Sequence, residues 1–433
     1  MTAHSCLQPG VSVAFEDLFD YGGNEIYIER PHGFGSLFYD KEDGKLYPKG
    51  PVIFQDILCK MKNAICIGFK RGDQIFINPE FDTILNPTDR LIIIAQEPYV
   101  SSIVDEIKVN VKNYDLNATI EQKKHENLLV LGANENMLQI LAEANKYLED
   151  NSTVLVGCTF EQIINAVRGV DVEKYSEKLH DLQYQITNAF DEELDKDKCI
   201  PYVKEFVETY IFYQNRETIE EKSALIKCHI NFKLMLKNIY KADSFEIMLK
   251  QTSKYLDEKE KINHILILSD TLIAPDDADE KVLFLLMNLR HHFNKKQNNV
   301  NITTEMRRSN NEAIATTSSV DDFIVSDLLV SNMVTQISRN KDLYEIFDNI
   351  LDSEGAEIYF EPFSDYINFD VERKQEFNFH EINKIVLSKS SKIPIGYRIK
   401  NADGDNEVII NPNKEAIVTI DKRDMVIVVA NEK

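Results

Sequence analysis

The sequence lacks the features that mark several common classes of protein. It has no tryptophan, and its 15 glycines and 12 prolines among 433 residues are too few for a collagen-like or low-complexity chain. No apolar run approaches the length of about 18 residues that a membrane-spanning helix needs. Residues 1–10 hold neither a basic segment nor an apolar core, so we expect no secretory signal. These absences leave a globular chain, 43% hydrophobic, that is long enough for roughly three folded units.

Positive charge is also scarce. The 49 lysines and arginines face 72 aspartates and glutamates, which gives a formal net charge of −23. Such a chain repels phosphate backbones at long range, so we expect no nucleic acid among its partners. Six cysteines are spread over the chain without a C-x-x-C pair. That usage is typical of buried, reduced thiols in a cytoplasmic protein rather than of a metal site or a catalytic thiol.

Two segments near the ends of the chain are copies of one another. Residues 15–28 and 347–360 share a phenylalanine, an aspartate, a glycine and a Glu-Ile-Tyr triplet at one offset. Three later pairs of segments stay in step with them: 67–69 with 395–397, 77–79 with 410–412, and 89–95 with 424–430. Chance similarity would not keep this order, so we predict two repeated α+β lobes of fewer than about a hundred residues each.

The middle of the chain alternates between strand and helix patterns. Short apolar runs predict strands, and longer segments with apolar residues three and four apart predict helices. The expected strands are 127–131, 153–156, a third near 229–235, 264–268, 300–304 and 322–325, and the expected helices are 137–148, 281–292 and 328–338. Such alternation predicts an α/β fold with a doubly wound parallel sheet, Rossmann-like, flanked by the two repeated lobes. A charged helical stretch, about 159–224, interrupts the rhythm as an insertion.

The turn after the first of these strands departs from the dinucleotide-binding pattern. That pattern, G-x-G-x-x-G, needs its second glycine so that the backbone can approach the pyrophosphate. Here Gly132 is followed by Asn134 and Met137 at the other two positions, and Glu135 would repel a phosphate at the helix start. No acid for a ribose hydroxyl follows the second strand. We therefore expect a Rossmann-like lobe whose phosphate site is closed.

Polar side chains gather where the predicted strands end. Asp270 follows the strand 264–268 and Glu305 follows the strand 300–304, at the edge where open α/β sheets bind ligands. We take Gly132, Asn134, Asn136, Asp270 and Glu305 as the candidate binding residues. Carboxylates suit Ca²⁺, but the twelve-residue calcium-loop pattern is absent, so solvated or helix-capping carboxylates remain the alternative. Neither a G-x-S-x-G nor an H-E-x-x-H motif occurs, and we expect no enzyme activity.

Several segments, taken in order, carry a resemblance to a known family: residues 302–315, 320–331, 347–359, 395–398 and 408–412. They resemble the CASTOR/POLLUX ion channels and their bacterial relatives. The match covers nearly the whole chain except residues 159–224, a stretch that is longer than usual in that family.

The resemblance implies a part in a larger assembly. Family members carry a membrane pore followed by two tandem RCK units (regulators of K⁺ conductance), each with a Rossmann-like lobe and a smaller C-terminal lobe. Four chains form a cytoplasmic gating ring that moves the gate when a ligand binds, Ca²⁺ in related channels and nucleotides in TrkA-type relatives. The resemblance therefore leaves two classes of ligand open for this chain, Ca²⁺ and a nucleotide. The expected partners are other copies of the chain and a pore domain.

The same resemblance divides the chain into parts. Residues 1–12 are expected to end a missing first Rossmann lobe, 13–115 to form the first C-terminal lobe, 125–340 the second Rossmann-like lobe, and 341–433 the second C-terminal lobe. The chain would thus lack the pore and most of the first unit, and the first lobe would expose an apolar face. The expected function is ligand-dependent regulation of the transport of potassium or another monovalent cation.

Two other classes of function stay open at this point. The doubly wound lobe could serve a nicotinamide-dependent oxidoreductase, which NADH fluorescence on titration would reveal. A scaffold without any ligand would instead combine a stable oligomer with flat thermal shifts.

Overall fold

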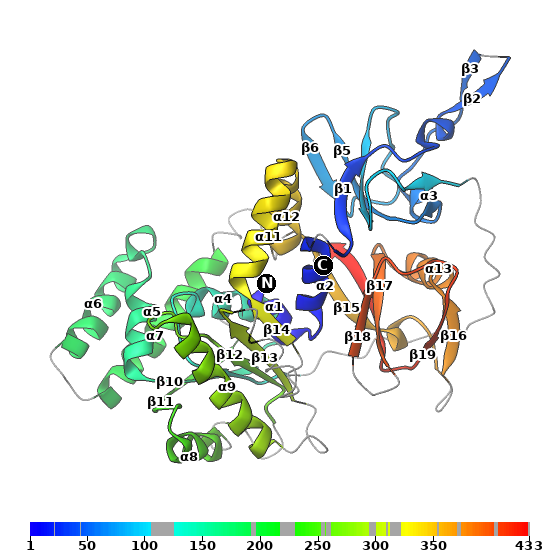
Figure 1. The fold of residues 1–433 in the computed structure, drawn as a ribbon. Coiled ribbons are helices and arrows are strands. Elements are labelled where there is room, and N and C mark those ends of the chain that lie inside the picture. Colours follow the sequence, from blue (N-terminus) through cyan, green and yellow to red (C-terminus); the bar gives the residue numbers. More distant parts are fainter. Residues whose placement is uncertain are drawn as a thin grey trace. The chain divides into compact units, whose positions relative to one another are not determined.

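The chain forms two compact units in the computed structural model. One unit comprises residues 1–12 and 123–328 and is called the sheet unit here; the other comprises residues 13–122 and 329–433 and is called the paired-lobe unit (Figure 1). The structure describes the chain except residues 21, 44, 105–124, 192–195, 217–229, 253–255, 257–260, 294–299, 309–310, 312–321, 353–354, 370–373, 402–405 and 432–433. None of the described helices is both long and apolar enough to cross a bilayer.

The sheet unit is built on six parallel strands. Their order is β11-β10-β9-β12-β13-β14. The strands are β9 (Leu128–Leu131), β10 (Thr153–Cys158), β11 (Asn231–Leu236), β12 (His264–Ile267), β13 (Asn301–Met306) and β14 (Asp322–Val325). The chain winds outward from β9 in one direction and from β12 in the other, so the predicted doubly wound fold is confirmed. The switch point lies between these two central strands.

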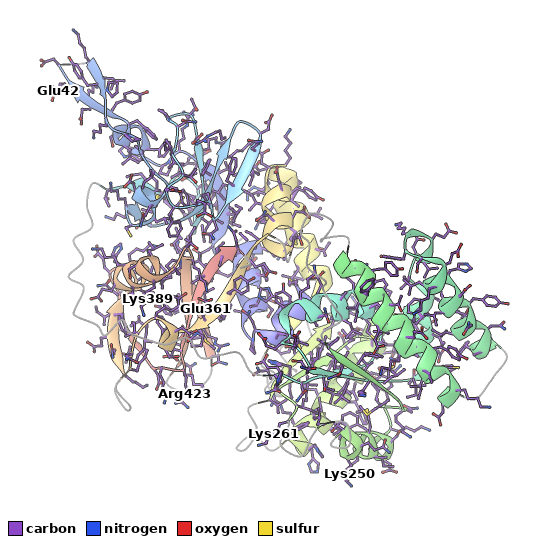
Figure 2. All side chains as sticks on the ribbon, turned by 180° about the vertical axis from the view of Figure 1, so that it is seen from behind. Glu42, Lys250, Lys261, Glu361, Lys389 and Arg423 are labelled. Atoms are coloured by element: carbon purple, nitrogen blue, oxygen red, sulfur yellow. The ribbon has the colours of Figure 1, made fainter. Side chains whose placement is uncertain are left out.

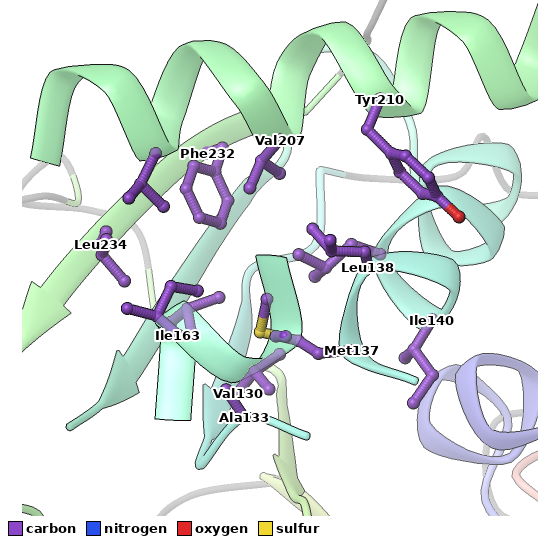
Figure 3. Close-up of a cluster of buried hydrophobic side chains, with 14 of the residues drawn as sticks. Val130, Ala133, Met137, Leu138, Ile140, Ile163, Val207, Tyr210, Phe232 and Leu234 are labelled. Atoms are coloured by element: carbon purple, nitrogen blue, oxygen red, sulfur yellow. The ribbon is translucent and has the colours of Figure 1, made fainter. Parts of the chain in front are cut away.

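Helices cover both faces of this sheet because its central strands are apolar on both sides. On one face, Val130, Met137, Ile163 and Phe232 belong to a single buried cluster (Figure 3). Burial of a side chain such as Phe232 contributes about 2–3 kcal/mol. The helices of this face are α4 (Met137–Tyr147), α5 (Phe160–Arg168), α6 (Glu177–Asp191) and α7 (Lys196–Arg216), with η2 (Val172–Lys174); α8 (Ala242–Thr252) and α9 (Pro275–His292) cover the other face. Helices α6 and α7 occupy the region predicted as an insertion.

The first helix of the chain completes the core of the sheet unit. Helix α1 (Thr2–Leu7) packs against α4 and against strands β12, β13 and β14. Its Ala3 and Cys6 side chains are buried in the same cluster as Val130. His4 stacks on Tyr147 at a ring-centroid distance of 5.1 Å, and burial lowers the pKa of His4 to about 3. That residues 1–12 end another Rossmann-like lobe stays a prediction. In the structure, α1 covers part of the sheet unit.

The paired-lobe unit contains two lobes with the same topology. Each has a four-stranded antiparallel sheet, ordered β1-β7-β5-β6 in the first lobe and β15-β20-β17-β18 in the second. The strands are β1 (Glu25–Glu29), β5 (Ile65–Arg71), β6 (Gln74–Ile77) and β7 (Arg90–Ala95), matched by β15 (Ala356–Pro362), β17 (Ile393–Lys400), β18 (Asn406–Ile410) and β20 (Met425–Asn431). The duplication predicted from the sequence is therefore confirmed as a repeated fold.

Each lobe adds a preceding helix and smaller elements to its sheet. Helices α2 (Val11–Phe19) and α12 (Leu343–Leu351) have the same length and lie 332 residues apart in the sequence. The first lobe also holds η1 (Phe34–Leu37), α3 (Gln55–Leu58) and the pairs β2 (Tyr39–Glu42) with β3 (Lys45–Pro48) and β4 (Met61–Lys62) with β8 (Ser102–Ile103). The second holds η4 (Phe363–Asp365), α13 (Phe379–Lys389) and the pair β16 (Gln375–Asn378) with β19 (Ile417–Ile420).

The two lobes repeat even their local irregularities. A β-bulge lies beside Gly68 in β5 and beside Gly396 in β17. Asn78 and Asn411 both have a positive φ, near 43° and 46°, and each backbone N–H donates to an isoleucine carbonyl at 2.8 Å. Left-handed conformations are tolerated better by asparagine than by most other residues, which accounts for the repeated Asn-Pro sequence.

Specific contacts join the two lobes. Phe19 and Phe347, from the equivalent helices α2 and α12, meet edge to face at 4.9 Å. Lys70 of the first lobe forms an ion pair with Asp342 at the start of α12. Asn411 donates a hydrogen bond to Asn24 across the lobes (3.1 Å). Because these contacts combine an aromatic pair with partly buried polar pairs, they fix which surfaces of the lobes face each other.

Candidate functional site

The predicted site residues meet at one edge of the six-stranded sheet. Gly132 directly follows β9 and Asp270 follows β12 by three residues, whereas Glu305 is the penultimate residue of β13 and does not follow the strand as predicted. The carboxyl ends of these adjacent parallel strands share one edge of the sheet. The sequence-based expectation that these segments come together is thus met in the structure.

Gly132 has the conformation that the sharp turn requires. Its φ is +89°, and a Cβ at this position would lie 2.9 Å from the carbonyl oxygen of Leu268. Its N–H donates to the carbonyl of Gly157 on β10 at 2.9 Å. Glycine alone combines this φ with this close approach of backbone. The turn is therefore packed tightly against the neighbouring strands.

Asn134 closes the turn over the end of the sheet. Its Nδ2 donates hydrogen bonds to the carbonyl oxygen of Ser269 (3.0 Å) and to Oε2 of Glu305 (2.9 Å). The backbone N–H of Ser269 donates to the same Glu305 oxygen at 3.2 Å. Asn136 takes part through its backbone N–H, which donates to Oδ1 of Asn134 at 3.1 Å, while its own side chain is exposed. Asn134, Ser269 and Glu305 are all buried, so this network is internal to the fold.

Asp270 belongs to a second, adjoining network. Its Oδ2 accepts from Nζ of Lys281 at 3.0 Å and from Nε2 of Gln162 at 3.4 Å. Gln162 also donates to the hydroxyl of Tyr240 at 2.8 Å, and Lys281 lies 4.7 Å from the centre of the Tyr240 ring. Burial raises the pKa of Tyr240 to about 12, so its hydroxyl stays protonated at neutral pH.

This arrangement does not fit a bound phosphate. The donors at the turn are already used by Glu305 and Ser269, and the carboxylates of Asp270 and Glu305 would repel an anion. A divalent cation would have to displace the Asn134 amide from these acceptor oxygens before it could bind. In the described part of the chain, no three His, Cys, Asp or Glu side chains come together to hold a metal ion. The Asn134 amide instead occupies the position between the two acceptor oxygens.

Sequence reasoning did not find three members of the site: Gln162, Lys281 and Tyr240. Thr159 and Gln162 form a capping box at the start of α5, with hydrogen bonds of 3.1 and 3.3 Å. The T-x-x-Q pattern could have located this helix start, but not the reach of Gln162 to Asp270. Lys281 is the seventh residue of α9 and reaches the site only because the fold brings α9 beside β12.

Asp279 lies in the second turn of α9, not in a loop, and its carboxylate stabilises the fold. It is fully buried, and it accepts from the backbone N–H groups of Arg307 (2.9 Å) and Arg308 (3.0 Å) and from Nδ2 of Asn311 (2.9 Å). These bonds tie the first turns of α9 to the chain leaving β13. Asp279 therefore serves as a buried acceptor within the fold, neither solvated nor at the start of a helix.

The Asn134–Glu305 contact yields a first prediction. Glu305→Ala leaves the buried Ser269 N–H and one N–H of Asn134 without their acceptor, so we expect it to lower the free energy of unfolding by about 2–4 kcal/mol. Glu135→Ala, at an exposed position in the same turn, is the matched control and should change stability by less than about 0.5 kcal/mol. Urea denaturation followed by circular dichroism measures both. Equal stability of the two variants would show that the network contributes little.

A family model and curated sequences are similar to this chain. Residues 1–110 match the model described as Castor and Pollux, part of voltage-gated ion channel. The ion channel DMI1 of Medicago truncatula is 21% identical over 95% of the chain and 41% of its own length. The probable ion channel POLLUX of Oryza sativa subsp. japonica is 20% identical over 98% of the chain and 39% of its own length. The chain thus spans about two fifths of these relatives, and the resemblance inferred from its sequence is confirmed.

A solved structure shows the same fold. The human SLO3 gating ring superposes with a TM-score of 0.56 at 12% sequence identity, over 99% of this chain and 74% of that one. At this identity the similarity concerns the fold alone. The chain therefore shares the fold of that gating ring: a doubly wound α/β sheet unit together with two copies of a small α+β lobe.

Proposed function

We propose that this chain, a relative of the CASTOR/POLLUX ion channels, is the regulatory gating-ring module of a channel for potassium or another monovalent cation, located on the cytoplasmic side of the membrane. One observation carries the proposal: a doubly wound sheet unit is combined in one chain with two copies of one small lobe that pack on each other. A regulatory role follows if a stimulus stabilises one arrangement of these parts more than another.

Helix α11 (Ser326–Arg339) carries an exposed apolar stripe that supports an interface with a further lobe or chain. Val330 and Val334, one turn apart, are 58% and 60% exposed, and the apolar side chains of Met333 and Ile337 continue the same stripe. Its opposite face is held by Gln336, which donates to the carbonyls of Leu18 (3.2 Å) and Phe19 (2.8 Å). An exposed stripe of this spacing on a packed helix is typical of an interface.

The duplication indicates what covers this stripe. Helices α1 and α2 follow one another in the first copy of the repeat, and α11 and α12 follow one another in the second. Helices α2 and α12 lie 332 residues apart, and the same offset places α1 on the last turns of α11. Since α1 completes the face of a doubly wound sheet, we infer that α11 does the same for another Rossmann-like lobe. That lobe corresponds to the first lobe expected from the family resemblance.

An assembly measurement tests this proposal. In the gene product that carries this sequence, Val330→Glu with Val334→Glu is expected to weaken assembly at least a hundredfold, because two carboxylates would be buried in an apolar contact and each 1.4 kcal/mol is a factor of about ten. Thr335→Glu, on an exposed position of the same helix, is the control. Native mass spectrometry and sedimentation velocity report the populations. Assembly that is unchanged in the double variant would rule out the stripe as an interface.

We also propose that the closed edge formed by Gly132, Asn134, Asn136, Asp270 and Glu305 is where a ligand would act. Binding there has to displace the Asn134 amide from Glu305, so a cation or a donor-rich group is favoured over a phosphate. Thermal shifts with Ca²⁺, NADH and ATP, compared between the wild type and Asn134→Ala, test this site. Flat shifts for all three compounds alongside a stable oligomer would favour a scaffold without a ligand.

A further inference from the structure

Lys414 is a buried lysine without an acidic partner. It lies in the turn between β18 and β19, its side chain is only 7% exposed, and its Nζ is 4.6 Å from the centre of the Phe379 ring. Within the described chain, no hydrogen bond or ion pair engages this Nζ. Other lysines of low or intermediate exposure pair with carboxylates, as Lys70 with Asp342, Lys281 with Asp270 and Lys392 with Glu361. Lys414 is thus placed where a charged ammonium is poorly supported.

The groups around Lys414 are mostly basic. His380 and Lys384, both on α13, act electrostatically on the same region, and the thiol of Cys59 comes from the first lobe. Glu415, the next residue, is exposed and acts on His380. The ring of Phe379 attracts a cation, but that attraction is weaker than the cost of burying an unpaired charge. These surroundings therefore favour a neutral amine at Lys414.

The pKa of Lys414 agrees with this geometry. Burial lowers the pKa of Lys414 to about 7, with the nearby Cys59 acting in the opposite direction. A lysine with an ordinary pKa of about 10.4 is almost wholly protonated at pH 7, so the neutral fraction here is roughly a thousandfold larger. A neutral lysine amine is a nucleophile, and buried lysines are used in this way in covalent chemistry.

We propose that Lys414 is a carbamylation site that takes up carbon dioxide. The Nζ lone pair forms an N–C bond to CO₂, one C–O π bond opens onto oxygen, and the nitrogen releases a proton to water, so neither an oxidant nor a reductant is needed. The product carries one negative charge. Lys384, which acts together with Lys414 on both Cys59 and His380, is the cation that an anion in this region requires, whereas burial lowers the pKa of His380 and leaves its ring neutral at pH 8. Uptake therefore turns an unpaired buried amine into an anion with a lysine in its surroundings.

The burial of Lys414 favours carbon dioxide over an anion such as phosphate as the molecule that reaches Nζ. Lys414 and Phe379 are both buried, so a hydrated phosphate would have to lose most of its water to reach Nζ. Carbon dioxide is small and uncharged, so it enters without the cost of desolvating a charge. The amine is the one buried lysine nucleophile that we find in the described residues.

The test is to trap the adduct in the folded chain. Protein equilibrated with ¹³C-labelled bicarbonate and CO₂ is alkylated with a trialkyloxonium salt and digested, and the peptides are analysed by mass spectrometry. We expect the labelled adduct on Lys414 at pH 8 and its loss at pH 6, because the amine is protonated as the pH falls through about 7. Lys392 is the internal control and should carry no adduct, because it pairs with Glu361. Figure 2 labels Glu361.

Two variants keep the proposal falsifiable if one of them folds poorly. Lys414→Arg keeps a long side chain but carries a permanent charge and is not expected to form the carbamate, and Lys384→Gln leaves the amine while removing one cation near the product. We expect no adduct in the first and at least a threefold lower yield in the second. Absence of the adduct in folded wild-type protein, or an equal yield on Lys392, would overturn the proposal. Neither result bears on the assembly of the chain, so the proposed function is tested separately.

Discussion

Gly396→Ala is expected to unfold the second lobe, and Gly68→Ala the first. A Cβ at Gly396 would lie 2.1 Å from the carbonyl oxygen of Ile409, and one at Gly68 would lie 2.0 Å from that of Phe76. Both oxygens belong to the backbone of the adjacent strand, so the clash cannot be relieved by a side-chain rotation. Such overpacking against a hydrogen-bonded strand should lower the free energy of unfolding by about 4 kcal/mol or more.

The duplication supplies a test within the molecule. Because the two glycines are equivalent, the two variants should lose similar stability, measured by urea denaturation. Gly50→Ala, where no atom lies within 4 Å of the added Cβ, should stay within about 0.5 kcal/mol of the wild type. If either bulge variant matched this control, the bulge geometry described here would be wrong for that lobe.

Phe347→Ala is expected to separate the two lobes as well as to destabilise them. Phe347 is 1% exposed and packs edge to face on Phe19, so its removal leaves a cavity that costs about 3–5 kcal/mol. Because the cavity opens at the contact between α2 and α12, the lobes should lose their shared unfolding transition.

Calorimetry of the Phe347→Ala variant distinguishes these outcomes. A single transition should broaden or split in the variant, while Tyr344→Ala, on an exposed position of the same helix, should leave it unchanged. A variant that unfolded in one sharp transition at the wild-type temperature would show that this aromatic pair does not couple the lobes.

The periodic parts of the fold could be predicted from the sequence. Apolar runs that alternate with amphipathic segments predicted the central sheet. The matched segments around residues 23 and 355 predicted the repeated lobes. Both signals are local, because a strand or a helix start is encoded in a few neighbouring residues. The small pairs β2 with β3 and β16 with β19 were not predicted, since each of their strands has only four residues.

The candidate site shows where sequence reasoning ends. The departure of Asn134 from glycine predicted a closed turn, and the structure supplies the closing contact to Glu305. The partners of Asp270 could not be predicted, because Gln162 and Lys281 reach it from helices that only the sheet brings together. Lys414 was missed for a similar reason: its burial depends on α13 and not on its neighbours in the sequence.

The most direct test of the central claim is an ion-flux measurement. The gene product that carries this sequence is reconstituted in lipid vesicles, and potassium flux is compared between the wild type and the Val330→Glu, Val334→Glu double variant, with Thr335→Glu as the control. The proposed role predicts cation flux whose regulation is lost in the double variant and kept in the control. Regulated flux that is identical in all three proteins, or no cation flux from any of them, would contradict a gating-ring role for this chain.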